Sequence, residues 1–146
     1  MIRRNPLNLE GAGIPESDWD KAELNGVRFA GANLSRANAR DAKFTHADMR
    51  HTILDGADFR GSLLDYANLT GARMVDTNLS YTNLNGAVFK GANLIRTNFT
   101  MAQMIGTNLE GVDLSNAVGL TVDQIRSARI DAATTFPAYL PEIHAA

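Results

Sequence analysis

Two histidines and three carboxylates lie close together in the sequence and are the first candidates for chemistry. In chain order this group consists of Asp41, His46, Asp48, His51 and Asp55. Imidazole and carboxylate groups bind metal ions or transfer protons when they converge within a few ångströms. The group would therefore form a site only if the fold brought these side chains to one place.

Other signatures of catalysis are absent from the sequence. The chain has no cysteine, which excludes disulfides, thiolate chemistry and cysteine zinc sites. It has no nucleophile elbow, Walker loop or dinucleotide-binding glycine pattern. A net charge of −2 argues against a protein that coats nucleic acid or an anionic membrane. We expect no enzyme, no cofactor, no bound metal, and no direct binding to nucleic acid or membrane.

The start of the chain shows no export signal. The first four residues include two arginines, but Asn5 and Pro6 follow where a signal peptide needs an apolar run. No segment approaches the roughly 18 consecutive apolar residues of a membrane-spanning helix. The expected location is therefore the cytoplasm.

An internal repeat of five residues determines the elements that would position any site. Every fifth residue from Leu24 to Leu114 is apolar, and the residue two positions before each of these centres is small. Asn or Asp usually precedes the centre, and glycine often stands two positions after it. Ala39 is the single small centre. The predicted structural core consists of Leu24, Phe29, Leu34, Phe44, Met49, Leu54, Phe59, Leu64, Leu69, Met74, Leu79, Leu84, Phe89, Leu94, Phe99, Met104, Leu109 and Leu114.

Neither a helix nor a flat strand keeps every fifth residue on one face. The pattern fits if each pentapeptide forms one short side of a coil, with the centre and the small residue pointing inward. Glycine suits the turn because it adopts backbone angles that other residues avoid. Four sides would close a coil of twenty residues, and Trp19 would then help to fill the space beside Ala39.

Three segments match a known motif in full. Residues 32–36, 67–71 and 92–96 read Ala-Asn-Leu followed by two variable residues. The chain resembles the pentapeptide repeat family, whose motif is A(D/N)LXX, over about residues 22–117. The resemblance implies an all-β fold, a right-handed quadrilateral β-helix, for this part of the chain.

The two ends depart from the repeat. Residues 1–21 keep the phase, but Pro15 and the acidic residues after it break the motif, so this segment is a cap or a degenerate first coil. Residues 118–146 begin with a capping-box pattern at Thr121 and Gln124, which predicts a short helix through about Arg129.

The apolar C-terminal segment has two interpretations. An open β-helix end needs a cover, which favours a cap. The resemblance also implies a dimer contact, since related proteins often pair through C-terminal elements. The candidate residues for either role are Ile125, Phe136, Tyr139 and Leu140.

Asp41, His46 and His51 of this group occupy turn positions and are expected to be solvated corner residues, because successive turns of a square coil point about a quarter turn apart. The outward apolar residues are the better functional candidates. Ile53, Val75 and Ile95 would share one side, which is the expected contact face. Tyr81 and Met101 would share a corner, and Tyr66 would lie at another. The first hypothesis is a rigid non-catalytic scaffold that binds a protein, or itself, through a lateral face.

The alternative function comes from the resemblance. Some pentapeptide repeat proteins mimic DNA, bind DNA gyrase and protect it from quinolones. Between Asp20 and Ala117 this chain has ten acidic and ten basic residues, and no loop interrupts the repeat between Glu23 and Asn116. A neutral rod without loops is a poor DNA mimic, so gyrase is the less favoured partner.

Overall fold

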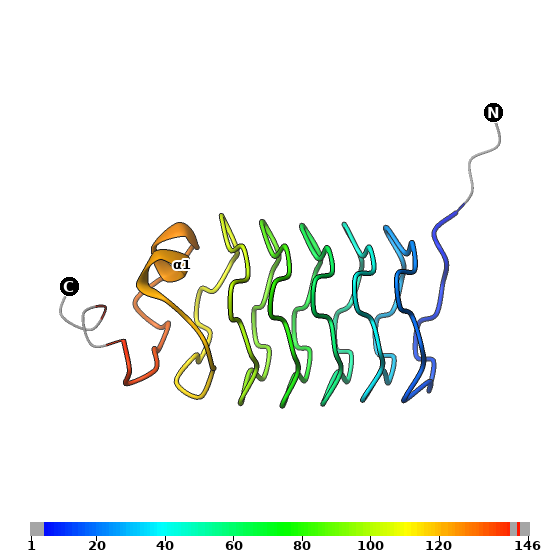
Figure 1. Ribbon diagram of the computed structural model, residues 1–146, viewed down its shortest axis with the longest axis horizontal. Helices are drawn as coiled ribbons and strands as arrows, with labels where there is room; N and C mark the ends of the chain where they lie inside the picture. The colour runs from blue at the N-terminus through cyan, green and yellow to red at the C-terminus, as the bar shows by residue number, and fades with distance from the viewer. Residues whose placement is uncertain (1–4, 141–142, 144–146) are drawn as a thin grey trace.

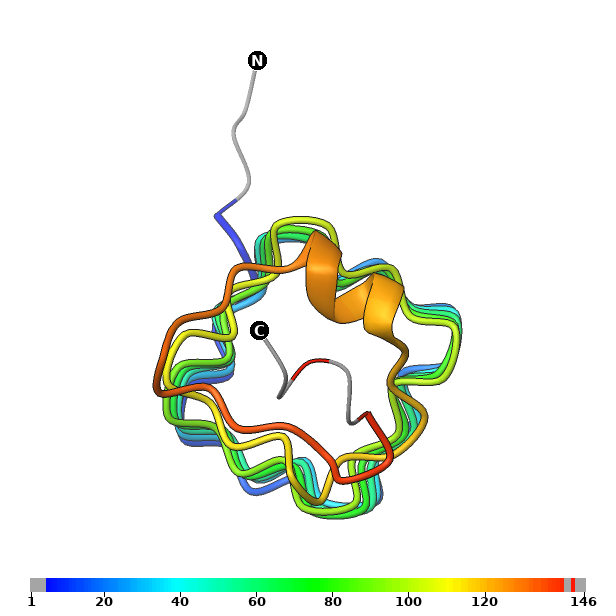
Figure 2. The same cartoon turned by 90° about the vertical axis from the view of Figure 1, so that its left-hand side faces the viewer.

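The structure, a computed structural model, describes residues 5–140 and 143 as a rod of stacked coils (Figure 1). Parallel bridges join residues twenty positions apart, from Asn8 with Arg28 to Asn98 with Val118. Each coil therefore has four five-residue sides, and the coils superimpose when viewed along the rod (Figure 2). Within the described residues every β segment is a single-residue bridge, without a longer strand.

The four sides are numbered here by their centres. Side 1 contains the centre Leu24, side 2 the centre Phe29, side 3 the centre Leu34 and side 4 the centre Ala39. Each side continues with every twentieth residue along the chain, as the bridges require. A corner, at the turn position of each repeat, separates one side from the next.

Short backbone hydrogen bonds explain why the five-residue period closes into coils. The Leu69 amide donates to the Val88 carbonyl of the next coil at 2.8 Å, and the Ala72 amide donates to the Leu69 carbonyl at 3.0 Å around the corner. The corner backbone is left-handed, with φ of 69° at Gly71 and 59° at Tyr66. Side chains adopt this conformation at a cost of about 1 kcal/mol, so glycine is common at the corners without being required.

The repeat centres point into the rod. Apart from Leu24, each predicted core residue is at most 2% exposed. Leu24 is half-buried because it lies in the first coil, at the N-terminal end of the stack. Ala39 is also buried, between Trp19 and Phe59 along side 4. Burial of one large and one small residue per side leaves a narrow, dry interior.

Aromatic rings fill much of the N-terminal half of this interior. Trp19 packs edge-on against Phe29 with ring centroids 5.8 Å apart, and Phe44 packs against Phe59 at 5.4 Å. Edge-to-face contacts of this kind add to the stabilisation from burial alone.

Buried hydroxyls at the small inward positions satisfy carbonyls of the backbone. Thr77 donates to the Leu54 carbonyl of the preceding coil at 2.7 Å, and Thr82 donates to the Leu79 carbonyl at 2.6 Å. Ser62 is the exception among the described residues, because its buried Oγ has no hydrogen-bond partner.

We expect Ser62→Ala to leave the free energy of unfolding unchanged or to raise it, because alanine removes a desolvated hydroxyl that bonds to nothing. Thr82→Val is the matched comparison, since it removes a bonded hydroxyl of similar burial and should cost about 1 kcal/mol. Urea unfolding followed by circular dichroism measures both variants. An equal loss in the two would contradict the assignment.

The repeat geometry begins before the motif becomes regular. Bridges join Gly13 to Asn33 and Asp18 to Asn38, so residues 8–26 form a coil despite Pro15. Its inward side chains, among them Trp19, are only partly buried. The first four residues of the predicted N-terminal segment lie outside the described residues.

A helix follows the last regular repeat. In α1 (Val122–Ser127), the Gln124 amide donates to Thr121 Oγ1 at 3.2 Å and the Thr121 amide donates to Gln124 Oε1 at 2.8 Å, which completes the predicted capping box. The prediction that the helix reaches about Arg129 is wrong. The helix ends two residues earlier because Arg129 extends to form a bridge with Asn108.

α1 lies at the C-terminal end of the rod, over one edge of the stacked coils (Figure 2). Its Ile125 is fully buried, and the Gln124 side chain donates to the carbonyls of Phe99 at 2.8 Å and Ala102 at 2.9 Å. No helix in the described part of the chain is long and apolar enough to cross a membrane. Residues 141–142 and 144–146 of the predicted C-terminal segment are not among the described residues.

Candidate functional site

The histidine group does not assemble into a site. His46 and His51 occupy successive corners, and the His46 ring stacks on Tyr66 with centroids 5.0 Å apart and an interplanar angle of 11°. The His51 ring lies over Gly71 of the next coil. Within the described residues, no three His, Asp or Glu side chains are placed to hold a metal ion. The corners thus direct these groups along the rod surface and not toward one another.

The outward Asn and Asp side chains serve the backbone. Asn68 Oδ1 accepts from the Thr70 amide at 3.1 Å, and Asn98 Oδ1 accepts from the Thr100 amide at 2.9 Å. Arg73 occupies the position before the centre, where most repeats have Asn. In this repeat, Asp55 of the preceding coil accepts from the Val75 amide at 3.0 Å instead. Short polar side chains are suited to such turns. The repeated Asn residues therefore have a structural role and present no catalytic array.

Many of the charged side chains on the rod are paired with one another. Arg96 Nε lies 2.7 Å from Asp76 Oδ1, and Arg73 Nε lies 2.6 Å from Asp55 Oδ2. The hydrogen bond from Arg96 lowers the pKa of the Asp76 carboxyl. Similar pairs join neighbouring coils along the rod: Arg28 with Glu10, Arg36 with Glu16, Arg40 with Asp58, Lys43 with Glu23 and Arg129 with Glu110.

The five residues predicted for protein contact fall on two separate surfaces. Ile53 and Ile95 are 39% and 38% exposed on side 3, where Val75 is half-buried. Tyr81 and Met101 are 55% and 67% exposed at the corner between sides 4 and 1. Side 3 therefore presents less apolar surface than the corner does.

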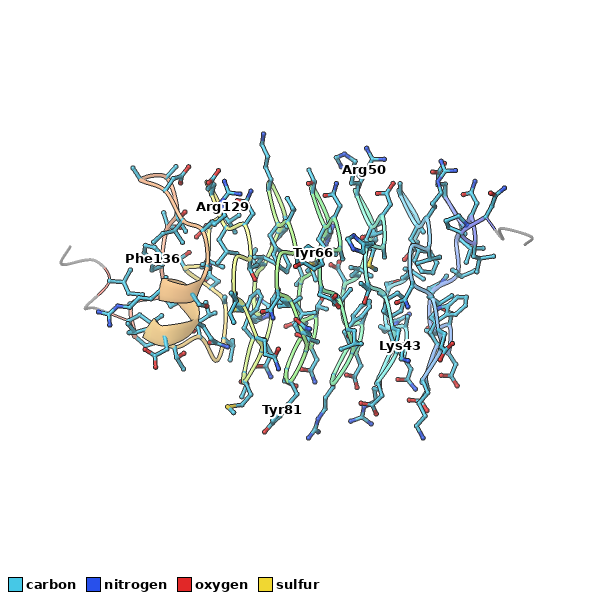
Figure 3. The ribbon with its side chains drawn as sticks, turned by 90° about the horizontal axis from the view of Figure 1, so that it is seen from above. Lys43, Arg50, Tyr66, Tyr81, Arg129 and Phe136 are labelled. Atoms are coloured by element: carbon cyan, nitrogen blue, oxygen red, sulfur yellow. The ribbon has the colours of Figure 1, made fainter. Side chains whose placement is uncertain are left out.

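The structure adds two neighbours to Tyr81 and Met101 that sequence reasoning missed, Leu63 and Ile105. Ile105 is 66% exposed and Leu63 is 37% exposed on side 1, and Tyr66 is 58% exposed at the next corner. We call this group the uncharged surface: Leu63, Tyr66, Tyr81, Met101 and Ile105. Figure 3 shows Tyr81 projecting from the edge of the rod.

Charge is nearly absent from the part of the chain that forms this surface. Residues 61–66, 81–86 and 101–106 contain one charged residue, Asp65, whose carboxylate accepts from the Thr45 hydroxyl at 2.9 Å. Residues 77–86 and 97–109 contain none. These charge-free runs are visible in the sequence and could have indicated the surface before the fold was known.

A groove adjoins the uncharged surface. It has a volume of about 410 Å³, and its lining is mostly charged: Tyr81, Gly61, Arg60, Arg40, Asp41, Asp20 and Lys21. The Arg60 guanidinium lies 5.3 Å from the centroid of the Tyr81 ring, within cation–π range. This contact helps to orient the exposed tyrosine.

The C-terminal candidates make contacts within the chain. Ile125 and Leu140 are buried, while Phe136 is half-buried. The Tyr139 hydroxyl donates to the Ala117 carbonyl at 2.8 Å, which ties the tail to the last repeat.

Solved structures similar to this chain are pentapeptide repeat proteins. HetL, involved in heterocyst differentiation regulation in the cyanobacterium Nostoc sp. strain PCC 7120, is 21% identical over 90% of this chain and 73% of its own, with a TM-score of 0.47. Rfr23 from the cyanobacterium Cyanothece 51142 is 23% identical over 89% and 88%, with a TM-score of 0.43. QnrB1, a plasmid-mediated fluoroquinolone resistance protein, is 23% identical over 98% and 93%, with a TM-score of 0.44.

Comparison of the sequence itself gives the family. No curated protein matches the chain at a significant level. The family profile described as Pentapeptide repeats (8 copies) matches residues 22–61, 42–80 and 72–111, which together span more than half of the chain. The stacked coils agree with the right-handed β-helix that this family implies. The chain belongs to the pentapeptide repeat family.

Proposed function

We propose that this chain is a non-catalytic scaffold that binds a partner protein through the uncharged surface. The observation that supports this proposal is the exposure of Tyr81, Met101 and Ile105, each above one half, on a surface almost without charge. The centres of protein interfaces are depleted in charge and enriched in aromatic residues and methionine. The surface has that composition.

The rigidity of the rod is a second argument for the proposed binding of a partner protein. The backbone beneath the surface is held from both neighbouring coils, for example where the Leu84 amide donates to the Gln103 carbonyl at 2.8 Å. A surface that is ordered before binding loses little conformational entropy when a partner docks. Asn83 and Gln103 add polar groups among the apolar side chains, as expected for an interface that also meets water.

Site-specific photo-cross-linking in the native host tests the proposal. A photoreactive residue at position 105 should give a discrete adduct with one protein, and Tyr81→Lys should remove that adduct because a charge is placed in the interface. The matched control carries the photoreactive residue in place of Ile95 on side 3, where we expect no adduct. Cross-linking from position 95 alone, or an adduct that persists in Tyr81→Lys, would contradict the assignment.

DNA mimicry receives less support than protein scaffolding. A mimic must present carboxylates in ordered rows, whereas Asp55, Asp76 and Glu110 are each paired with an arginine. We therefore expect the purified chain to give no protection of DNA gyrase supercoiling against a quinolone. Protection that rises with the concentration of the chain would establish the gyrase function in place of the scaffold.

We infer that the C-terminal segment is a cap and not a dimer contact. The burial of Ile125 and Leu140, together with the Tyr139 hydrogen bond to the last repeat, supports this inference. Sedimentation of Leu140→Asp separates the two roles. If the segment is a cap, the native variant should have the same mass as the parent chain, and only its free energy of unfolding should fall. If the segment is a dimer contact, the mass of the native species should be halved.

A further inference from the structure

The N-terminal edge of the rod forms a second surface, and the groove beside Tyr81 extends to its Asp20 and Lys21. We infer that this edge binds an extended, positively charged segment of another protein by strand addition along side 4, over residues 17–21. The inference rests on the free backbone groups of the first coil, on the partly exposed core at that end, and on the charges around it. It is independent of the proposed scaffold function.

In the first coil, some of the backbone amides and carbonyls that later coils use to pair with the preceding coil have no such partner. Inside the rod, the Asn38 amide donates to the Ser17 carbonyl at 2.9 Å, while the Trp19 amide donates to the Asn38 carbonyl at 2.6 Å. The corresponding amide of Asp18, and the carbonyls of Asp18 and Asp20, have no backbone partner among the described residues. A parallel strand laid on side 4 would accept one hydrogen bond and donate two, which repeats the pairing found between coils.

The apolar core is also open at this end. Ile14 and Trp19 are only partly buried, whereas the corresponding centres of the next coil, Leu34 and Ala39, are at most 2% exposed. At the opposite end, α1 packs over one edge of the stack (Figure 2), and both Ile125 and Leu140 are buried. An added strand with apolar residues would therefore bury surface that the rod itself leaves exposed at one end only.

The charges at the N-terminal edge indicate what kind of segment would bind there. Residues 8–26 contain five acidic residues and one lysine. Glu10, Glu16 and Glu23 pair with cations of the next coil, which leaves two acidic side chains at the edge. Asp18 and Asp20, on either side of Trp19, have no cationic partner in the described structure, and the Asp18 carboxylate only accepts from the Asp20 amide and the Asn38 side chain. Two copies meeting at this edge would oppose like charges, which disfavours self-association. Lysine or arginine alternating with apolar residues fits both the charges and the open core.

The single tryptophan of the chain reports directly on this edge, because it is Trp19. We would titrate the full chain with a short synthetic peptide of alternating lysine and valine and follow the fluorescence. The expected result is a saturable blue shift, because the added strand removes water from the indole. A glutamate–valine peptide should give no shift. A lysine–valine peptide methylated on alternate backbone nitrogens should also give none, since it keeps the charge but loses hydrogen-bond donors.

Variants then separate the edge from general charge attraction. Asp18→Asn with Asp20→Asn should raise the Kd for the lysine–valine peptide about tenfold, as expected for the loss of two exposed charge pairs. The control, Asp76→Asn with Asp123→Asn, removes the same charge elsewhere and should leave the Kd unchanged. Equal binding of the methylated peptide, an equal effect of the control, or no shift at all would overturn the inference. A blue shift that depends on protein concentration without peptide would assign the edge to a second copy instead.

Discussion

Leu69→Asp should unfold the whole rod under native conditions. Leu69 is fully buried in the middle of side 2, where an aspartate carboxylate would have no cationic partner. Burial of an unpaired charge costs several kcal/mol, against a total stability of about 5–15 kcal/mol for a domain. Because each coil is supported by its neighbours, disruption in the middle should spread to both ends.

Far-ultraviolet circular dichroism and urea unfolding measure this effect. The matched control is Asn68→Asp, which adds the same charge one residue earlier on the outward face. Its carboxylate oxygen can still accept from the Thr70 amide, as Asn68 Oδ1 does at 3.1 Å. The control should remain folded. If Leu69→Asp unfolded at the same urea concentration as the parent chain, the inward assignment of the repeat centres would be wrong.

Phe59→Ala should lower the free energy of unfolding by about 3–5 kcal/mol, the usual cost of removing a buried phenylalanine side chain. Phe59 is 1% exposed and packs edge-on against Phe44. Its neighbour along side 4 is Ala39, the one small centre of the repeat, so the truncation would place two alanines in succession. The resulting cavity should be difficult to close by relaxation.

A second substitution tests whether this cavity is the cause. Ala39→Leu alone should cost about 1–3 kcal/mol through overpacking. Combined with Phe59→Ala, it should restore part of the lost stability because the leucine side chain enters the vacated space. Urea unfolding of the two single variants and the double variant gives the coupling energy. Additive losses would show that Ala39 and Phe59 do not share a packing space.

Sequence reasoning located the inward residues well because their constraint is local. A five-residue side has one inward centre, and each of the nineteen centres is apolar or alanine, so a shift by one residue would bury Asn or Asp. The capping box at Thr121 and Gln124 was visible for the same reason, since its partners are three residues apart. The end of α1 was misplaced because the bridge between Arg129 and Asn108 is a long-range contact.

The candidate site was predicted less completely. The sequence predicts Tyr81 and Met101 as outward apolar residues of one corner, but it favours the side of Ile53, Val75 and Ile95 for contact, where the structure shows less exposed apolar side chains. Ile105 and Leu63 were overlooked, although both occur in runs with little charge. The histidine group contrasts with this, because Asp41, His46 and His51 occupy successive corners, as the repeat predicts, and point apart.

The sequence by itself determined the period, the inward residues and the twenty-residue coil, since these follow from a rule that each pentapeptide obeys alone. Only the tertiary structure decided how exposed each outward residue is and which ones meet. Tyr81 and Ile105 belong to successive coils, and Arg73 pairs with Asp55 eighteen residues earlier. Such contacts arise when coils stack and side chains lean across corners, and five-residue periodicity carries no information about them.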